Sequence, residues 1–94
     1  MSEIWSVYMV RCKNNSLYTG MAKDVQKRFE EHCAQGIKTA KYLRGKTPLE
    51  LVYQEEIGSR SDALKIEHLI KKLSRAQKNE LVKLGQYKGI VQLG

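Results

Sequence analysis

Glu67 is the residue whose place in the sequence points most directly to chemistry. It lies four residues after Ala63 and three before Ile70, inside an apolar stripe that repeats at helical spacing. A carboxylate on the core-facing side of a helix costs free energy unless a cation or a metal ion pairs with it. Two explanations stay open: a structural salt bridge with one of the many lysines and arginines, or a metal ligand.

Arg28 and His32 form a second pair of chemically useful side chains. They are four residues apart, so they share one face of a predicted helix. A guanidinium can hold a phosphate through two parallel hydrogen bonds, and an imidazole can move or orient a proton near neutral pH. Lys27 and Glu31 stand beside them, so an ordinary solvated helix face is the alternative.

Tyr8 and Tyr18 lie on two short predicted strands, "SVYMV" and "LYTG", joined by a segment rich in turn residues. A single tyrosine on a strand is most often half-buried, with its hydroxyl in water. Gly20, at the end of the second strand, allows either a bent backbone or the close approach of a ligand. Taken alone, these residues describe a hairpin.

The charge of the chain indicates the kind of partner. Its 94 residues include 17 Lys plus Arg against 10 Asp plus Glu, a formal net charge of +7. This excess favours a polyanion, because basic residues that neutralise phosphates release condensed counterions. A basic surface with no particular partner is the alternative. No apolar run approaches the ~18 residues of a membrane helix, and "MSEIWS" lacks a secretory signal pattern, so we expect a cytoplasmic protein with no membrane partner.

The two cysteines, Cys12 and Cys33, are too few for a disulfide scaffold, and we expect them to be free thiols. A zinc site built from both cysteines with His32 and His68 is conceivable, but the sequence lacks any paired C-x-x-C spacing.

Strand and helix signals predict a single α+β domain at residues 1–85, followed by a C-terminal tail at 86–94. The order β-β-α-β-α-α predicts a small antiparallel sheet flanked by helices. The expected elements are strands at Ile4–Cys12, Leu17–Thr19 and Leu49–Glu56, a helical turn near Thr39–Leu43, and helices at Val25–Gln35, from Ser59 to a break at Ser74, and at Arg75–Leu84.

Capping residues set the predicted helix limits. Asp24 is the expected N-cap of the first helix and Gly36 its stop, and the helix's apolar stripe is Val25, Phe29 and Cys33. Capping-box patterns at Ser59 with Asp62, and at Ser74 with Gln77, mark the two later helix starts.

The ordered combination of these residues resembles the GIY-YIG nuclease superfamily, in particular its small stand-alone bacterial members. The resemblance runs from about Ile4 to Lys83, and its strongest stretch is "VYMV…LYTG…KRFEEH…ALKIEHLIKKLSRAQK". The superfamily fold, a three-stranded antiparallel sheet flanked by helices, agrees with the predicted element order. Three motif positions depart from the pattern: the first motif reads Ser6-Val7-Tyr8, with Ser6 in place of glycine, and the second has Thr19 in place of isoleucine.

The resemblance assigns roles to the chemically useful residues. Tyr8 matches the tyrosine of the first motif and would take or relay a proton from the attacking water. Tyr18 and His32 would position that water and Tyr8. Arg28 would clamp the scissile phosphate, and Gly20 would let the backbone approach the substrate.

The resemblance also implies a metal ion and a nucleic-acid substrate. Glu67 matches the acidic ligand of one divalent metal, Mg²⁺ or Mn²⁺, and no organic cofactor is implied. Asn79, twelve residues beyond Glu67, matches a polar position seen in some members. We expect further substrate contacts from Lys23, Lys41 and Arg44.

The function so predicted is endonuclease-like hydrolysis of phosphodiester bonds in DNA, with repair or processing as its setting. One alternative is a basic nucleic-acid-binding module with little or no cleavage. Another is a structural or protein-interaction domain. The nuclease prediction requires Tyr8, Arg28 and Glu67 to converge on one cleft.

Overall fold

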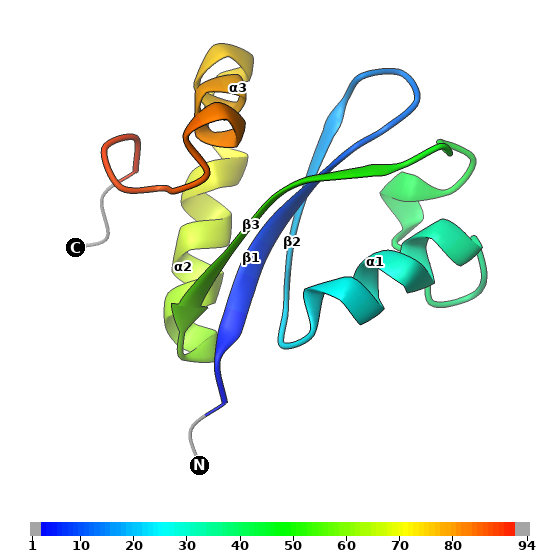
Figure 1. The fold of residues 1–94 in the computed structure, drawn as a ribbon, viewed down its shortest axis with the longest axis horizontal. Coiled ribbons are helices and arrows are strands. Elements are labelled where there is room, and N and C mark those ends of the chain that lie inside the picture. The colour runs from blue at the N-terminus through cyan, green and yellow to red at the C-terminus, as the bar shows by residue number, and fades with distance from the viewer. Residues whose placement is uncertain (1–2, 92–94) are drawn as a thin grey trace.

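The first strand in the chain is the central strand of the sheet. The computed structural model describes residues 3–91. In it, β1 (Trp5–Arg11) lies between β2 (Leu17–Ala22) and β3 (Glu50–Gly58), and both pairings are antiparallel (Figure 1). All side chains of residues 6–10 are buried, because β1 has neighbours on both edges and helices against both faces. The predicted α+β fold with a three-stranded antiparallel sheet is confirmed.

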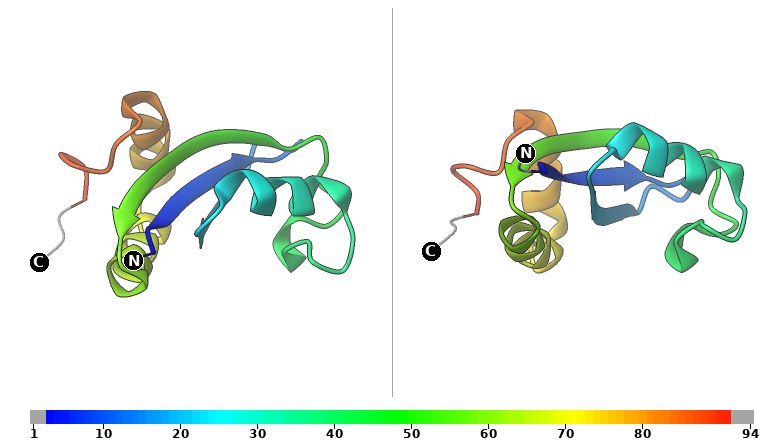
Figure 2. Two further views of the ribbon diagram at one scale, coloured as in Figure 1. Left: turned by 60° about the horizontal axis from the view of Figure 1, so that its bottom comes forward. Right: turned by 90° about the horizontal axis from the view of Figure 1, so that it is seen from below.

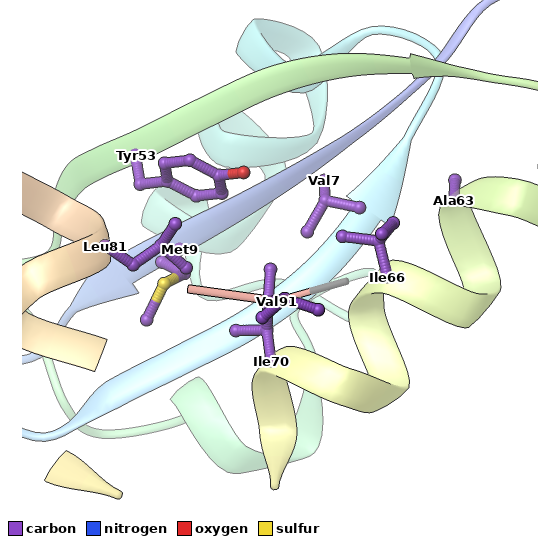
Figure 3. Packing of buried hydrophobic residues seen from close by; sticks show 8 residues of the cluster. All are labelled: Val7, Met9, Tyr53, Ala63, Ile66, Ile70, Leu81 and Val91. Carbon is purple, nitrogen blue, oxygen red and sulfur yellow. The ribbon is translucent and has the colours of Figure 1, made fainter. Parts of the chain in front are cut away.

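The helices divide between the two faces of the sheet. The sheet runs between α1 (Val25–Ala34) on one side and α2 (Arg60–Lys71) with α3 (Arg75–Leu84) on the other (Figures 1 and 2). The face toward α2 and α3 carries the larger apolar cluster, shown in Figure 3, which comprises Val7, Met9, Tyr53, Ala63, Ile66, Ile70, Leu81 and Val91. The other face carries a cluster of Tyr8, Val10, Cys12, Val25 and Leu43.

Local capping chemistry starts the helices where the sequence predicts. Asp24 Oδ1 accepts a hydrogen bond from the backbone N–H of Lys27 at 3.0 Å, and Ser59 caps α2 in the same way through Asp62. Ser74 and Gln77 form a reciprocal capping box that separates α3 from α2.

Several predicted limits shift by one or two residues. The second strand continues past Gly20 to Ala22, and β3 runs to Gly58 rather than Glu56. Helix α1 ends at Ala34, and its C-cap Gln35 adopts the left-handed conformation with φ of 56°, so Gly36 is not the stop. The predicted turn is a short 3₁₀ helix, η1 (Lys41–Leu43).

The predicted C-terminal tail packs against the domain as far as it is described. Tyr87, Ile90 and Val91 contact the larger apolar cluster. The backbone N–H of Tyr87 donates to Glu55 Oε1 at 2.9 Å, and the hydroxyl of Tyr53 donates to the same oxygen at 2.6 Å. Residues 86–91 therefore share the core of residues 3–85, and residues 92–94 lie outside the described part of the chain. Between residues 3 and 91, none of the helices has both the length and the apolar character needed to cross a bilayer.

Candidate active site

Tyr8 and His32 form a buried pair between the sheet and α1. Their side chains are 1% and 0% exposed, and Tyr8 Oη lies 2.9 Å from His32 Nε2. The other ring nitrogen, Nδ1, accepts a hydrogen bond from the backbone N–H of Ala40 at 3.2 Å. A backbone N–H can only donate, so Nδ1 carries no proton, and a neutral imidazole must carry its proton on Nε2. His32 therefore donates to the oxygen of Tyr8, and the proton of Tyr8 is directed elsewhere.

The electrostatic surroundings keep His32 in this neutral form. Burial lowers the pKa of His32 below its ordinary value, and the positive charge of Arg28 lowers it further. Protonation would also place an N–H on Nδ1 against the N–H of Ala40. His32 is thus a buried hydrogen-bond donor for Tyr8, and the solvated-face alternative is wrong for this residue.

Because His32 is buried, the side of α1 that faces the sheet differs from the side that the sequence predicts. Val25 is buried, Phe29 is half-buried and His32 is fully buried, whereas Cys33 is exposed. The inward positions follow the spacing i, i+4, i+7, so His32 takes the place that the predicted apolar stripe gave to Cys33. The sequence could not show this, because the backbone partner of His32 comes from a loop eight residues later.

That loop folds back onto α1 through several hydrogen bonds. Thr39 Oγ1 donates to the carbonyl oxygen of Glu31 at 3.0 Å. Gln35 Nε2 donates to the carbonyl oxygen of Leu43 at 3.2 Å, and Gln35 Oε1 accepts from the backbone N–H of Gly45 at 2.8 Å. These contacts fix the position of Ala40, and hence the orientation of the imidazole.

Gly20 provides the space that the Tyr8 hydroxyl occupies. Tyr8 and Gly20 are paired across β1 and β2. A Cβ atom on Gly20 would lie 2.6 Å from Tyr8 Oη and 3.1 Å from Cε2 of Tyr18. Any side chain at this position would therefore displace Tyr8. The predicted role of Gly20 in substrate approach stays a prediction, and the structure gives it a role in seating Tyr8.

Tyr18 and Arg28 lie around the same hydroxyl. The ring centroid of Tyr18 is 6.3 Å from that of Tyr8 and 5.7 Å from that of His32. The Nη1 atom of Arg28 donates to Glu31 Oε1 at 3.0 Å and to the carbonyl oxygen of Lys38 at 2.6 Å. Arg28 is thus a half-buried, oriented guanidinium.

Glu67 sits on α2 and is 9% exposed, as its place in the apolar stripe predicts. Helix α2 packs on the sheet face opposite Tyr8, but it contacts β2, which is an edge strand of the sheet. Within the described part of the chain its carboxylate makes one ion pair, with Lys71 Nζ at 3.7 Å from Oε1. Among the described residues, the structural salt bridge expected as one explanation of Glu67 is therefore a long contact to an exposed lysine.

The pKa values of Tyr8 and Tyr18 are affected by Arg28 on α1 and by Glu67 on α2. Burial raises the pKa of Tyr8 well above its ordinary value, Tyr18 raises it further, Arg28 lowers it, and Glu67 raises it. Burial likewise raises the pKa of Tyr18, which Arg28 lowers and Glu67 raises. The charges of Arg28 and Glu67 thus act on both tyrosines. The expected convergence of Tyr8, Arg28 and Glu67 on one cleft stays a prediction, because Glu67 lies on a helix that packs on the opposite face of the sheet.

Glu67 suits a hard divalent cation with few protein ligands. No group of three or more His, Cys, Asp or Glu side chains that could hold a metal ion occurs in residues 3–91. Mg²⁺ commonly keeps several waters and uses one or two carboxylates, so a single carboxylate with one distant ion pair fits that mode of binding. The conceivable zinc site is wrong, because no such group of side chains occurs in residues 3–91: Cys12 is buried just after β1, whereas Cys33 and His68 are exposed.

The other predicted substrate contacts are scattered. Lys23 pairs with Glu3 at 2.8 Å and lies over the ring of Trp5, at the far end of β1 from the hairpin turn. Lys41 and Arg44 are exposed at η1. Asn79 lines a separate pocket of about 300 Å³ that includes Arg11 and Lys83 but no other predicted site residue.

The sequence reasoning missed three residues beside the site, Tyr42, Lys71 and Lys78. Together with Tyr18, they line an open hollow next to β2. The two lysines repeat at i and i+7 across the break between α2 and α3, and neither carries a signal that separates it from other surface lysines. Only the fold brings them together.

Comparison with known proteins gives a consistent result. A family model of the GIY-YIG catalytic domain matches residues 4–80. A UPF0213 protein of Cronobacter sakazakii is 50% identical over 80 residues, which cover 85% of this chain and 82% of the relative. A UPF0213 protein of Vibrio cholerae is 52% identical over 79 residues, covering 83% and 76% of the two chains.

A solved structure shares the fold as well. The solution NMR structure of a UPF0213 protein from Bacillus halodurans aligns with a TM-score of 0.56 at 38% sequence identity, covering 97% of both chains. The matched residues 4–80 contain the buried Tyr8–His32 pair, Arg28 and Glu67. The chain therefore belongs to the GIY-YIG family, whose catalytic domain is of nuclease type.

Proposed function

We propose that this protein is a metal-dependent endonuclease that hydrolyses phosphodiester bonds in DNA. The observation that carries the proposal is the buried Tyr8 hydroxyl, which accepts a hydrogen bond from the buried His32 between the sheet and α1. A module that only binds nucleic acid has no use for a buried tyrosine–histidine pair or for a carboxylate in the core stripe. The net charge of +7 suits a polyanionic substrate.

Each side chain has a distinct task in the proposed reaction. Arg28 holds the scissile phosphate and stabilises the negative charge that shifts onto its oxygens. Tyr8 first loses its own proton to solvent water, and the resulting tyrosinate then accepts the proton of the attacking water. His32 keeps its Nε2–H on the Tyr8 oxygen, where the hydrogen bond stabilises the tyrosinate form. Tyr18 orients the water against Tyr8.

The carboxylate of Glu67 would hold Mg²⁺ or Mn²⁺, releasing Lys71 from its ion pair. A bound ion of this kind supplies positive charge that neutralises the phosphate and stabilises the leaving oxygen. Within the chain, the positive charge of Arg28 lowers the pKa of Tyr8 and so opposes the rise that burial causes.

A basic binding module with little cleavage is the second candidate function. The half-buried Lys78 and the exposed Lys41 and Arg44 favour it, because all three offer positive charge to a phosphate backbone without any role in the chemistry. DNA repair or processing in the cytoplasm is the setting that we propose for either function.

A cleavage assay on a panel of substrates tests the proposal. End-labelled single-stranded, duplex and branched DNA are incubated with Mg²⁺ or Mn²⁺, and each reaction is repeated with EDTA. We expect metal-dependent products from at least one substrate and none from Glu67→Ala or Arg28→Ala. Binding of all three substrates without cleavage would select the binding module. Products that survive Glu67→Ala would place the activity elsewhere or in a contaminant.

A further inference from the structure

An open hollow lies beside the candidate active site along the edge strand β2. It has a volume of about 420 Å³ and is lined by Leu17, Tyr18, Thr19, Tyr42, Lys71 and Lys78. These residues come from β2, η1, α2 and α3. Tyr18 belongs to both the hollow and the group around the Tyr8 hydroxyl, and Lys71 is the ion-pair partner of Glu67. A ligand in the hollow would therefore adjoin the scissile bond of a bound substrate.

The charge of the hollow is positive. Lys78 is half-buried and has no carboxylate within ion-pair distance among residues 3–91. Lys71 Nζ lies 3.7 Å from Glu67 Oε1, so this long ion pair neutralises the charge of the lysine only in part. Two lysines beside one hollow attract an anion, because like charges held together gain from a shared counterion. Thr19 also lines the hollow, and its buried hydroxyl has no hydrogen-bond partner within residues 3–91.

The opposite side of the hollow is aromatic. Tyr42 is 46% exposed, and its ring stacks on Tyr18 with centroids 5.9 Å apart and an interplanar angle of 25°. Lys46 Nζ lies 3.4 Å from the centre of the Tyr42 ring, so a base that stacks there takes the place of this lysine. An exposed aromatic ring next to lysines is the combination on which nucleic-acid bases stack while their phosphates are neutralised.

We propose that this hollow binds the nucleotide next to the scissile phosphate, with its base against Tyr42 and its phosphate held by Lys78 and Lys71. The inference rests on the proposed function for the identity of the substrate. It assigns Tyr42 and Lys78 as residues that position the strand, and neither takes part in bond cleavage.

Binding measured without metal tests this separately from cleavage. A fluorescein-labelled twelve-nucleotide single strand, as DNA and as RNA of one sequence, is titrated in EDTA at several salt concentrations and followed by anisotropy. We expect Lys78→Gln to weaken binding about two- to tenfold and to reduce the salt slope by about one. Lys72→Gln is the matched control, since Lys72 is exposed at the end of α2 and does not line the hollow. It should change neither quantity.

Tyr42 is tested in the same assay. Tyr42→Ala should weaken binding roughly five- to 100-fold, whereas Tyr42→Phe keeps the ring and should bind like the unmodified protein. Equal losses in Lys78→Gln and Lys72→Gln, or equal losses in Tyr42→Ala and Tyr42→Phe, would overturn the assignment. If the variants behave as expected but nothing is cut with metal, the nuclease proposal fails and the hollow stands only as a nucleotide-binding site. If DNA is cut and neither variant alters binding, the hollow fails and the nuclease proposal stands.

Discussion

The Nε2–H of His32 donates to the hydroxyl oxygen of Tyr8 over 2.9 Å, because the N–H of Ala40 occupies the other ring nitrogen. This arrangement makes His32 a donor rather than a base in the resting protein. It also gives Tyr8 and His32 different expected roles. In the proposed reaction Tyr8 would act on the substrate, and His32 would act through Tyr8.

Replacing Tyr8 by Phe should remove cleavage while leaving substrate binding intact. Loss of a positioned general base typically costs about 10²–10⁴-fold in rate, so we expect a loss of that size in single-turnover cleavage. Tyr53→Phe is a matched control, because Tyr53 is also a buried tyrosine with a bonded hydroxyl but lies in the other apolar cluster. Tyr53→Phe should lower stability and keep the cleavage rate. Equal rates for the two variants would contradict the role of Tyr8.

The stability of the fold should fall in mild acid because of His32. Its pKa is lowered in the folded protein, whereas the unfolded chain should titrate near the ordinary value of 6.5. The unfolded state therefore takes up a proton first as the pH falls below about 6.5, and the free energy of unfolding declines by at most about 1.4 kcal/mol per pH unit from this group. The contribution of His32 to the free energy of unfolding is therefore complete above about pH 6.5. It decreases as the pH falls toward the lowered pKa of His32 in the folded protein.

Urea unfolding between pH 8 and pH 5 measures this effect. His32→Gln should be less stable at pH 8 and show a flatter dependence on pH in this window. His68→Gln is the control, because His68 is exposed on α2. If removing His32 leaves the pH dependence unchanged, a different group carries it.

Gly20→Ala should disturb Tyr8 directly. The added Cβ would lie 2.6 Å from the Tyr8 hydroxyl oxygen and 2.7 Å from Cζ, closer than such contacts allow. Overpacking of this kind costs about 1–3 kcal/mol, so we expect lower stability and slower cleavage. Gly36→Ala is the control, since a Cβ there meets no atom within 4 Å. Equal effects in the two variants would show that the space over Gly20 is not what seats Tyr8.

The rate of cleavage should rise with pH if Tyr8 acts as a base. Burial keeps its pKa high, so the hydroxyl is protonated at neutral pH and the tyrosinate fraction grows about tenfold per pH unit below that pKa. His32 is bonded to this hydroxyl, and the other groups that affect its pKa are Tyr18, Arg28 and Glu67. Of these, His32 stays neutral throughout the alkaline range. A single-turnover rate that does not change between pH 7 and pH 9, with substrate fully bound, would contradict tyrosinate as the base.

Much of the fold could be predicted because its signals are local. Asp24, Ser59 and Ser74 cap their helices through neighbours in the chain, and alternation of apolar residues marks the strands. The sequence alone could not show that β1 is buried on both faces, since its alternation reads like that of a half-exposed strand. It also could not place the tail, because Glu55 meets Tyr87 from 32 residues away.

The same distinction between local signals and tertiary contacts holds for the candidate site. The residue types at Tyr8, Arg28 and Glu67 could be recognised from their order in the chain, and Glu67 also from its place in an apolar stripe. The burial of His32 depends on the loop that returns to Ala40, and the hollow beside Tyr18 depends on how α2 and α3 meet β2. Such contacts come from tertiary packing, which no local spacing encodes.

The most direct test of the account is the single-turnover cleavage rate of Glu67→Gln in saturating Mg²⁺ or Mn²⁺, measured beside the unmodified protein on the same labelled DNA. Glutamine keeps the shape of the side chain but removes the charge that would hold the cation. We predict that the variant binds the DNA with similar affinity and yields no product above the EDTA control. Cleavage by Glu67→Gln at the rate of the unmodified protein would contradict a metal-dependent site built on Tyr8, Arg28 and Glu67.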